Sequence, residues 1–197
     1  MRARFFAIAL LLAGCAGPVP KPPDQPGGWG KFTGPFNVEL LEDGRRLRLL
    51  NDVTYTDPVG RVWVAPAGWV VDGATIPKQF WSYIGGPLEG RYRNASIFHD
   101  VVCDKRDRPW DAAALMFYNA MRCGGVKEDK AKVMYAAVYL YGPHWPAPGA
   151  PASVRGMAQA SRPPSQQEVE RVKNFIETKN PSLEQIRALD TPADANR

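Results

Sequence analysis

Short segments of alternating hydrophobic and polar residues fill the chain between residues 36 and 71. The segments FNVELLE and RRLRLL flank Asp43-Gly44, and Asp-Gly supplies the positive φ angles that a two-residue hairpin turn requires. The segments VTYT and RVWVAP flank Asp57-Pro58-Val59-Gly60 in the same manner, and Gly68-Trp69-Val70-Val71 adds a further strand. The period-2 pattern therefore predicts a small antiparallel sheet in the N-terminal half of the chain.

From Ile76 onward the hydrophobic period changes to that of helices. Two of these helices are joined by a short connection and are expected to form a hairpin. In chain order, helices are predicted at KQFWSYI, 91–104, about 109–123, 127–142, 165–179 and 182–189. We therefore predict an α+β fold in which a small antiparallel sheet is followed by a helical hairpin and further helices.

The N-terminus has the features of a secretory signal. Arg2 and Arg4 precede the apolar run Phe5–Ala13, which is too short to span a bilayer as a mature helix. The run ends in LAGC, which resembles the lipobox of bacterial lipoproteins. This resemblance implies cleavage before Cys15, with lipid on its thiol and on the new amino terminus. The alternative is an ordinary signal in which the cysteine is incidental.

The same resemblance predicts where the protein resides and how the chain is divided. Ala16, rather than an aspartate, follows the cysteine, which implies a lipid anchor at the periplasmic face of the outer membrane. The expected parts are a lipoprotein signal peptide at 1–14, a Pro/Gly-rich tether at 15–35, a globular domain at 36–145, and a linker with a polar helical tail at 146–197.

The charge of the mature chain is weak. Removal of residues 1–14 takes two arginines and no acid, so the 25 basic residues become 23 against 20 acidic ones. Lysine and arginine are scattered among the acids rather than gathered into a stripe, which argues against a nucleic-acid-binding surface. The lipid predicted on Cys15 makes the membrane the expected partner.

Two cysteines remain once Cys15 carries lipid. Cys103 lies near the end of one predicted helix and Cys123 at the far end of the next. An antiparallel hairpin separates such positions by roughly 15 Å or more, beyond the reach of a disulfide. We therefore expect two buried thiols.

His99 is one of two histidines and stands among apolar residues in SIFHDVV. On a helix, Cys103 lies one turn after it on the same face, and Asp111 begins the next helix. If the connection at 105–108 is tight, Asp111 lies within about a turn of His99, near enough for its carboxylate to orient the imidazole.

Two interpretations of this group use Asp111. In a hydrolase, His99 would activate water, Asp111 would hold its tautomer, and Asp100 would bind a hard cation such as calcium. In the structural interpretation, His99 is a partly buried helix residue that is hydrogen-bonded to Asp111, and Asp111 also suits a helix N-terminus.

Two further interpretations do not need Asp111. A transition-metal site would use His99, Asp100 and Asp104, with His144 as a second histidine if it folds back. A nucleophile site would pair Cys103 with His99, although this spacing is common by chance.

Several segments together resemble an uncharacterised family of bacteria and tailed phages, the domain of unknown function numbered 1353. They are VDGATIPKQFWSYIGGP, RNASIFHD, WDAAALMFYNAM and YLYGPHW, within about residues 45–145. The combination of DGATIP with a later HD is the most specific part. The resemblance implies a shared fold and a phage or envelope association, without an established activity.

An HD pair on one helix, followed by an aspartate on the next, resembles the secreted phospholipases A2, especially the prokaryotic ones. This resemblance implies His99 as base, Asp100 as calcium ligand and Asp111 as the residue that orients the histidine. Asp72-Gly73 is expected near a cation loop, with Asp72 as a second ligand, although it does not match that family's loop. The chain also lacks the disulfides between the paired helices, and Cys103 is one place later than the family's cysteine.

DGATIP also has a local structural interpretation. Asp72-Gly73 suits a turn, and Thr75 suits the cap of a helix that starts near Ile76. A turn and a helix cap are enough to explain the residues of this segment without a catalytic or metal-binding role.

Three functions remain open. The leading hypothesis is a cell-envelope lipoprotein of the uncharacterised, phage-associated family. The second is a cation-assisted hydrolase of lipids or other esters, with His99 and Asp111 as a dyad. The third is a non-enzymatic binding module that presents its sheet or some of its tryptophans to an envelope partner.

Overall fold

The computed structural model describes residues 28–73, 76–86, 88–149 and 163–189. The predicted signal peptide, Cys15, most of the predicted tether, the predicted cap Thr75 and much of the linker lie outside the described residues. None of the described helices combines the length and the apolar character needed to cross a bilayer.

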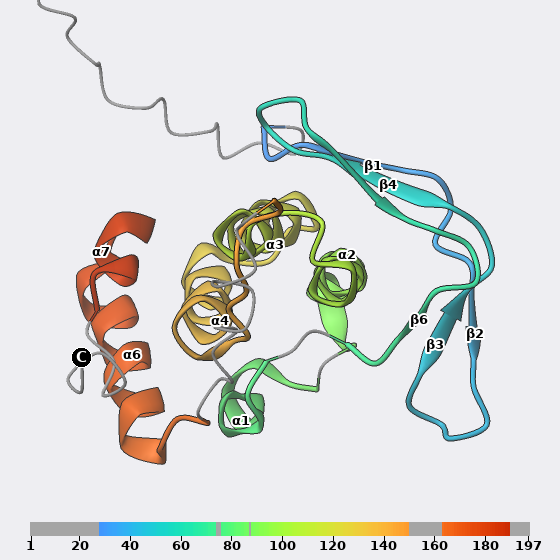
Figure 1. Cartoon of the computed structure of the whole chain (residues 1–197). Coiled ribbons are helices and arrows are strands. Elements are labelled where there is room, and N and C mark those ends of the chain that lie inside the picture. The colour runs from blue at the N-terminus through green and yellow to red at the C-terminus, as the bar shows by residue number, and fades with distance from the viewer. Residues whose placement is uncertain (1–27, 74–75, 87, 150–162, 190–197) are drawn as a thin grey trace, which may run out of the picture.

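Within the described residues, the strands form two antiparallel sheets rather than the single sheet expected from the sequence (Figure 1). The first sheet has the order β1-β4-β5, with β1 (Lys31–Thr33), β4 (Val53–Thr56) and β5 (Val62–Ala65). The second has the order β2-β3-β6, with β2 (Val38–Leu40), β3 (Leu47–Leu49) and β6 (Val70–Val71). Alternation predicts that a segment is a strand, but it does not determine which strand becomes its partner.

Both predicted hairpins are present, but the turn between β2 and β3 is longer than two residues. The last paired residues are Leu40 and Leu47. Gly44 has the expected positive φ of 66°, whereas Asp43 does not, because its carboxylate accepts hydrogen bonds from the Arg45 and Arg46 N–H groups. An aspartate that bonds the backbone ahead of it stabilises this wider turn.

Strand β1 lies within the range predicted as tether, so the ordered domain begins before residue 36. Trp29 is buried, and its carbonyl accepts a hydrogen bond from the Tyr55 hydroxyl. Phe32 of β1 contacts the rings of Tyr55 and Phe98, which joins the first sheet to helix α2. These contacts connect residues 29–33 to the core.

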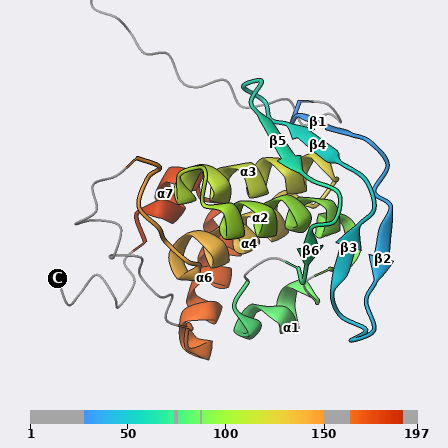
Figure 2. The same ribbon diagram turned by 45° about the vertical axis from the view of Figure 1, so that its right-hand side comes forward.

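The helices follow the predicted order closely. Short 3-10 turns η1 and η2 precede α1 and α2, and α2 and α3 form the predicted hairpin, in which they pack side by side (Figure 2). The elements are η1 (Lys78–Phe80), α1 (Trp81–Ile84), η2 (Gly90–Tyr92), α2 (Arg93–Lys105), α3 (Trp110–Cys123), α4 (Glu128–Tyr141), α6 (Gln166–Lys179) and α7 (Leu183–Arg187). This arrangement confirms the predicted α+β fold.

The polar C-terminal helices pack against α4 on the side away from the sheets (Figure 1). Their apolar residues are buried, and Lys132 of α4 donates a hydrogen bond to Asn180 at the end of α6. Arg187 of α7 donates another to the Tyr135 hydroxyl. The buried residues of the two helices include Val169, Val172, Ile176 and Ile186. Helix α4 is therefore enclosed between α3 on one side and α6 and α7 on the other.

Candidate functional site

His99 lies inside the helical hairpin, with only 3% of its surface exposed. Its ring centroid is 4.9 Å from that of Phe117 on α3, and Cys103 Sγ lies 3.7 and 3.8 Å from the two ring nitrogens. Burial penalises the charged imidazolium and lowers the pKa of His99 to about 4. At neutral pH the imidazole ring is therefore uncharged. Its low exposure means that other side chains enclose it.

The structure does not bring Asp111 to His99. Asp111 is exposed in the first turn of α3, where its carboxylate accepts a hydrogen bond from the Ala112 N–H. In an antiparallel hairpin, a residue six places before the end of α2 faces a residue about as far into α3, which here is Phe117. The six residues between Asp111 and Phe117 correspond to about 9 Å along the helix axis. Among the described residues, no hydrogen bond joins Asp111 to His99.

Cys103 is the polar neighbour that His99 does have. The i,i+4 spacing brings its sulfur against the ring, as the nucleophile interpretation requires. A pKa of about 4, however, leaves His99 without the positive charge that would stabilise a thiolate at neutral pH. Cys103 and Cys123 do not form a disulfide with each other, and both are half-buried rather than buried as expected.

The second histidine is held elsewhere. His144 stacks on Trp110 with ring centroids 3.7 Å apart, and its Nε2 lies 2.8 Å from the Tyr139 carbonyl oxygen. It therefore does not fold back to complete a metal site with His99.

Asp100 joins the two most specific sequence motifs. Its side chain is buried in α2, and Oδ2 accepts a hydrogen bond of 2.7 Å from the Gly73 N–H in DGATIP. The pKa of Asp100 is raised to about 8, mainly because burial penalises the charged carboxylate and in smaller part because of the charges of Asp72 and Asp104. Hydrogen bonds from the Gly73 and Asp72 backbone oppose this rise. Asp100 thus fixes the Asp72-Gly73 turn against the hairpin.

This environment does not fit calcium well. Backbone N–H groups point at the Asp100 carboxylate, whereas a hard cation requires oxygen lone pairs around it. In the part of the chain that the structure describes, no three His, Cys, Asp or Glu side chains are grouped so that they could hold a metal ion. The predicted ligands Asp72 and Asp100 lie near each other, but Asp72 is exposed while Asp100 is bonded to the backbone.

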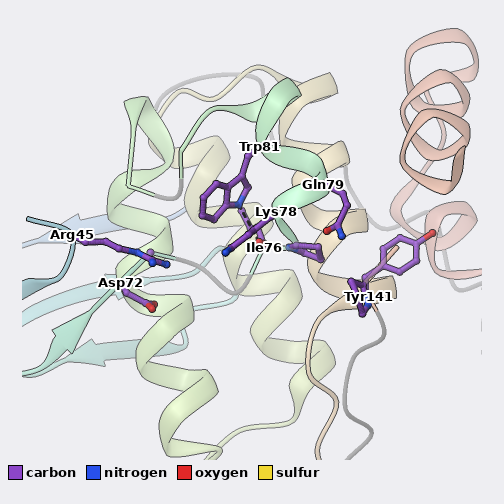
Figure 3. A pocket seen from close by; sticks show the side chains of 10 residues that line it. Arg45, Asp72, Ile76, Lys78, Gln79, Trp81 and Tyr141 are labelled. Atoms are coloured by element: carbon purple, nitrogen blue, oxygen red, sulfur yellow. Dashed lines mark hydrogen bonds between the residues drawn. The ribbon is translucent and has the colours of Figure 1, made fainter. Parts of the chain in front are cut away.

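A cavity of about 470 Å³ opens beside the Asp72-Gly73 turn (Figure 3). Arg45 and Lys78 supply positive charge there, and Trp81 supplies an indole whose Nε1 donates to the Ile76 carbonyl. Figure 3 shows the Lys78 amino group pointing toward the side on which Arg45 and Asp72 lie. The lining residues are Arg45, Asp72, Gly73, Ile76, Pro77, Lys78, Gln79, Trp81, Tyr141 and Pro163.

Among these residues, the sequence predicts only Asp72 and Gly73 to lie near a cation site. Trp81 follows DGATIP closely, and its place in KQFWSYI was the available signal. Arg45 comes from the β2–β3 turn and Pro163 from the segment before α6, and no local pattern links either of them to residue 78.

Comparisons with known proteins agree with the motif pair. Residues 47–138 match the family model described as "Protein of unknown function (DUF1353)". The chain is 45% identical over 119 residues to "Uncharacterized protein y4jT" of Sinorhizobium fredii, which covers 59% of this chain and 35% of that protein. It is 36% identical over 115 residues to "Uncharacterized protein y4iH" of the same organism, which covers 58% of this chain and 48% of that protein.

The chain thus spans about a third to a half of the length of these curated relatives. No solved structure matches it. Nothing in the comparisons supports the resemblance to phospholipases A2. The expected resemblance to family 1353 is confirmed over residues 47–138, which include both DGATIP and the HD pair.

Proposed function

We propose that the protein is a lipid-anchored cell-envelope protein whose globular domain is a binding module. The LAGC segment that ends at Cys15 supports the anchor. The cavity beside Asp72-Gly73 supports the binding module, because side chains of several elements converge there around an open space.

One observation carries the choice of this cavity. Within residues 28–73, 76–86, 88–149 and 163–189, no ion pair joins Arg45 or Lys78 to an acidic side chain, although both line the same cavity. A cation without an acidic partner can bind an incoming carboxylate or phosphate. Trp81 and Ile76 add apolar surface next to these cations. The expected ligand therefore has an anionic group beside an apolar or planar part.

The rigidity of the cavity wall supports the same proposal. The hydrogen bond from Gly73 to Asp100 attaches the DGATIP turn to α2, so the wall is held before a ligand arrives. A preformed site loses less conformational entropy on binding. The partner we favour is an envelope or phage protein that presents an acidic segment.

The hydrolase hypothesis receives no comparable support. His99 is enclosed in the hairpin, does not line the cavity, and faces Phe117 rather than Asp111. A general base must reach the proton that it removes. If purified wild-type protein hydrolysed phospholipids or short-chain esters and His99→Ala abolished this activity, our preference would be wrong.

The cavity is tested by charge reversal. Chemical cross-linking in intact cells, followed by purification, should give an adduct with wild-type protein that is lost in the Arg45→Glu/Lys78→Glu double variant. Lys179→Glu is the matched control, because it reverses an exposed charge at the end of α6, outside the cavity lining. The same adduct in all three proteins would exclude the cavity as the binding site.

The anchor is tested separately. Wild-type protein should incorporate labelled palmitate and fractionate with the outer membrane, and Cys15→Ser should lose the label. Label that persists in Cys15→Ser would overturn the lipidation site.

A further inference from the structure

Three valines near one end of the first sheet are exposed. Val59 is 80% exposed in the turn between β4 and β5, and Val62 and Val64 are 48% and 45% exposed on β5. The intervening Trp63 and the following Ala65 are buried. Because alternate residues of a strand point to opposite faces, Val62 and Val64 lie on the outer face of the sheet, away from the core.

The residues that pair with Val62 and Val64 on this outer face include no acid. Val62 pairs with Thr56, which pairs with Lys31 on the next strand, and Val64 pairs in the same way with Thr54 and then Thr33. The face therefore consists of valine, threonine and one lysine.

Asp57, the acid that follows β4, is buried, and its side chain stabilises the β4–β5 turn. Its carboxylate accepts hydrogen bonds from the Val59 and Arg61 N–H groups and from Trp63 Nε1. A further bond from the Gly60 N–H to the Asp57 carbonyl closes the turn. The turn thus holds Val59 outward, while the exposed Arg61 adds a second positive charge and lies over the Trp63 ring.

This end of the sheet is also where the chain from Cys15 enters the fold. Lys31 lies beside Thr56, and Thr56 precedes the β4–β5 turn, so the start of β1 is next to that turn (Figure 1). Twelve residues separate Cys15 from Gly28. At about 3.3–3.6 Å per residue, they keep Gly28 within roughly 45 Å of the lipid.

We propose that this end of the first sheet rests on the membrane surface. Val59, Val62 and Val64 enter the boundary between headgroups and acyl chains, and Lys31 and Arg61 lie at the level of anionic headgroups. Exposed aliphatic side chains flanked by cations suit such a surface. The inference rests on the proposed lipid anchor, which brings the valines to the bilayer.

The alternative occupant of this face is a protein. Strand β5 is an edge of its sheet, and such edges can pair with another chain. The membrane is favoured because the anchor enters at the same end and because the paired residues of this face include Lys31 and no acid, with the exposed Arg61 in the adjacent turn.

Photo-crosslinking in the full-length, lipidated protein distinguishes the two occupants. The crosslinker p-benzoyl-phenylalanine replaces Val59, and in a matched control it replaces Leu40, which is 61% exposed on an edge strand of the second sheet. In cells with radiolabelled phospholipid, illumination should give a lipid adduct at position 59 and none at position 40. A protein adduct at position 59, equal lipid adducts at both positions, or no adduct at position 59 would overturn the inference.

Palmitate labelling of the same samples separates the two proposals. Labelled protein without a lipid adduct at position 59 overturns the membrane contact and leaves the anchor intact. Protein without palmitate overturns both. A second variant, Val59→Asp with the crosslinker at Val62, should lose most of the lipid adduct at position 62, because a charged tip resists insertion. Unchanged yield there also contradicts the proposal.

Discussion

Asp100 Oδ2 accepts a hydrogen bond of 2.7 Å from the backbone N–H of Gly73, which lies 27 residues earlier in the chain. The bond connects the DGATIP turn to the HD pair on α2. It explains in physical terms why both motifs occur together in one fold, since each satisfies a buried polar group of the other. Asp100 therefore acts as a positioning residue for one wall of the cavity.

Replacement of Asp100 by alanine should destabilise the fold. The Gly73 N–H would lose its buried acceptor, which costs about 1–3 kcal/mol of unfolding free energy. Asp100→Asn keeps an acceptor oxygen in the same place and should retain most of the stability. Urea unfolding at neutral pH measures both values. Equal losses in the two variants would show that this hydrogen bond does not matter.

The stability of the wild-type protein should depend on pH through Asp100. Its pKa is raised from 3.8 to about 8, so between these values the folded state binds more protons than the unfolded state. The contribution is fully present below about pH 4 and is lost as pH rises through 8. The difference in unfolding free energy between wild type and Asp100→Asn should therefore decline across this range. A difference independent of pH would contradict the raised pKa.

His99 should act in the opposite direction. Its pKa is lowered from 6.5 to about 4, so between these values the unfolded state binds the extra proton. Stability from the neutral ring is present above pH 6.5 and is lost as pH falls toward 4. His99→Leu has no such proton and should lose less stability than wild type between pH 6.5 and 4. Parallel acid unfolding curves for the two proteins would mean that His99 is not buried as described.

Gly30 tests whether the segment before residue 36 belongs to the domain. Its φ is +94°, and an added Cβ would collide with the Thr56 carbonyl oxygen and the Tyr55 ring. Gly30→Ala should cost about 2–5 kcal/mol from overpacking and backbone strain together. The matched control is Gly44→Ala, where φ is also positive but space is open, with a cost of about 1–2 kcal/mol. Thermal melting that ranks the two variants equally would place Gly30 outside the packed domain.

The C-terminal helices should contribute directly to stability. Ile176 on α6 is buried, and Ile176→Ala should cost about 2–5 kcal/mol because it leaves a cavity. Lys179→Ala on the same helix changes an exposed residue and should stay within about 0.5 kcal/mol of wild type. Denaturant unfolding measures both. If Ile176→Ala changes the unfolding free energy as little as Lys179→Ala does, the packing of α6 on the domain does not contribute to stability.

Much of the fold could be predicted because the signals are local. The alternation in VTYT and RVWVAP, on either side of Asp57–Gly60, is enough to specify β4 and β5 as a hairpin. Helical periodicity ended by Gly124-Gly125 likewise specifies α3. Strand β1 was missed because three residues among glycines and prolines are too few to show a period.

The candidate site was less accessible to prediction. The sequence indicated that DGATIP and HD matter, and it identified His99, Asp100, Asp111 and Asp72 as polar residues of interest. It could not indicate that Phe117 rather than Asp111 faces His99. Which residue of α3 faces His99 depends on where α2 ends and where α3 begins. A shift of one helical turn at either end would place a different α3 side chain opposite each residue of α2.

The sequence by itself therefore determined the order and type of the elements, because turn residues, caps and hydrophobic periods act over a few neighbouring positions. Only the tertiary structure decided that the strands divide into two sheets, that Asp100 bonds to Gly73, and that Arg45 and Lys78 line the same cavity as Trp81. The residues that these relationships join lie far apart in the chain: 25 positions for Lys31 and Thr56, 27 for Gly73 and Asp100, and 33 for Arg45 and Lys78. The relationships arise from the packing of whole elements, which local patterns do not encode.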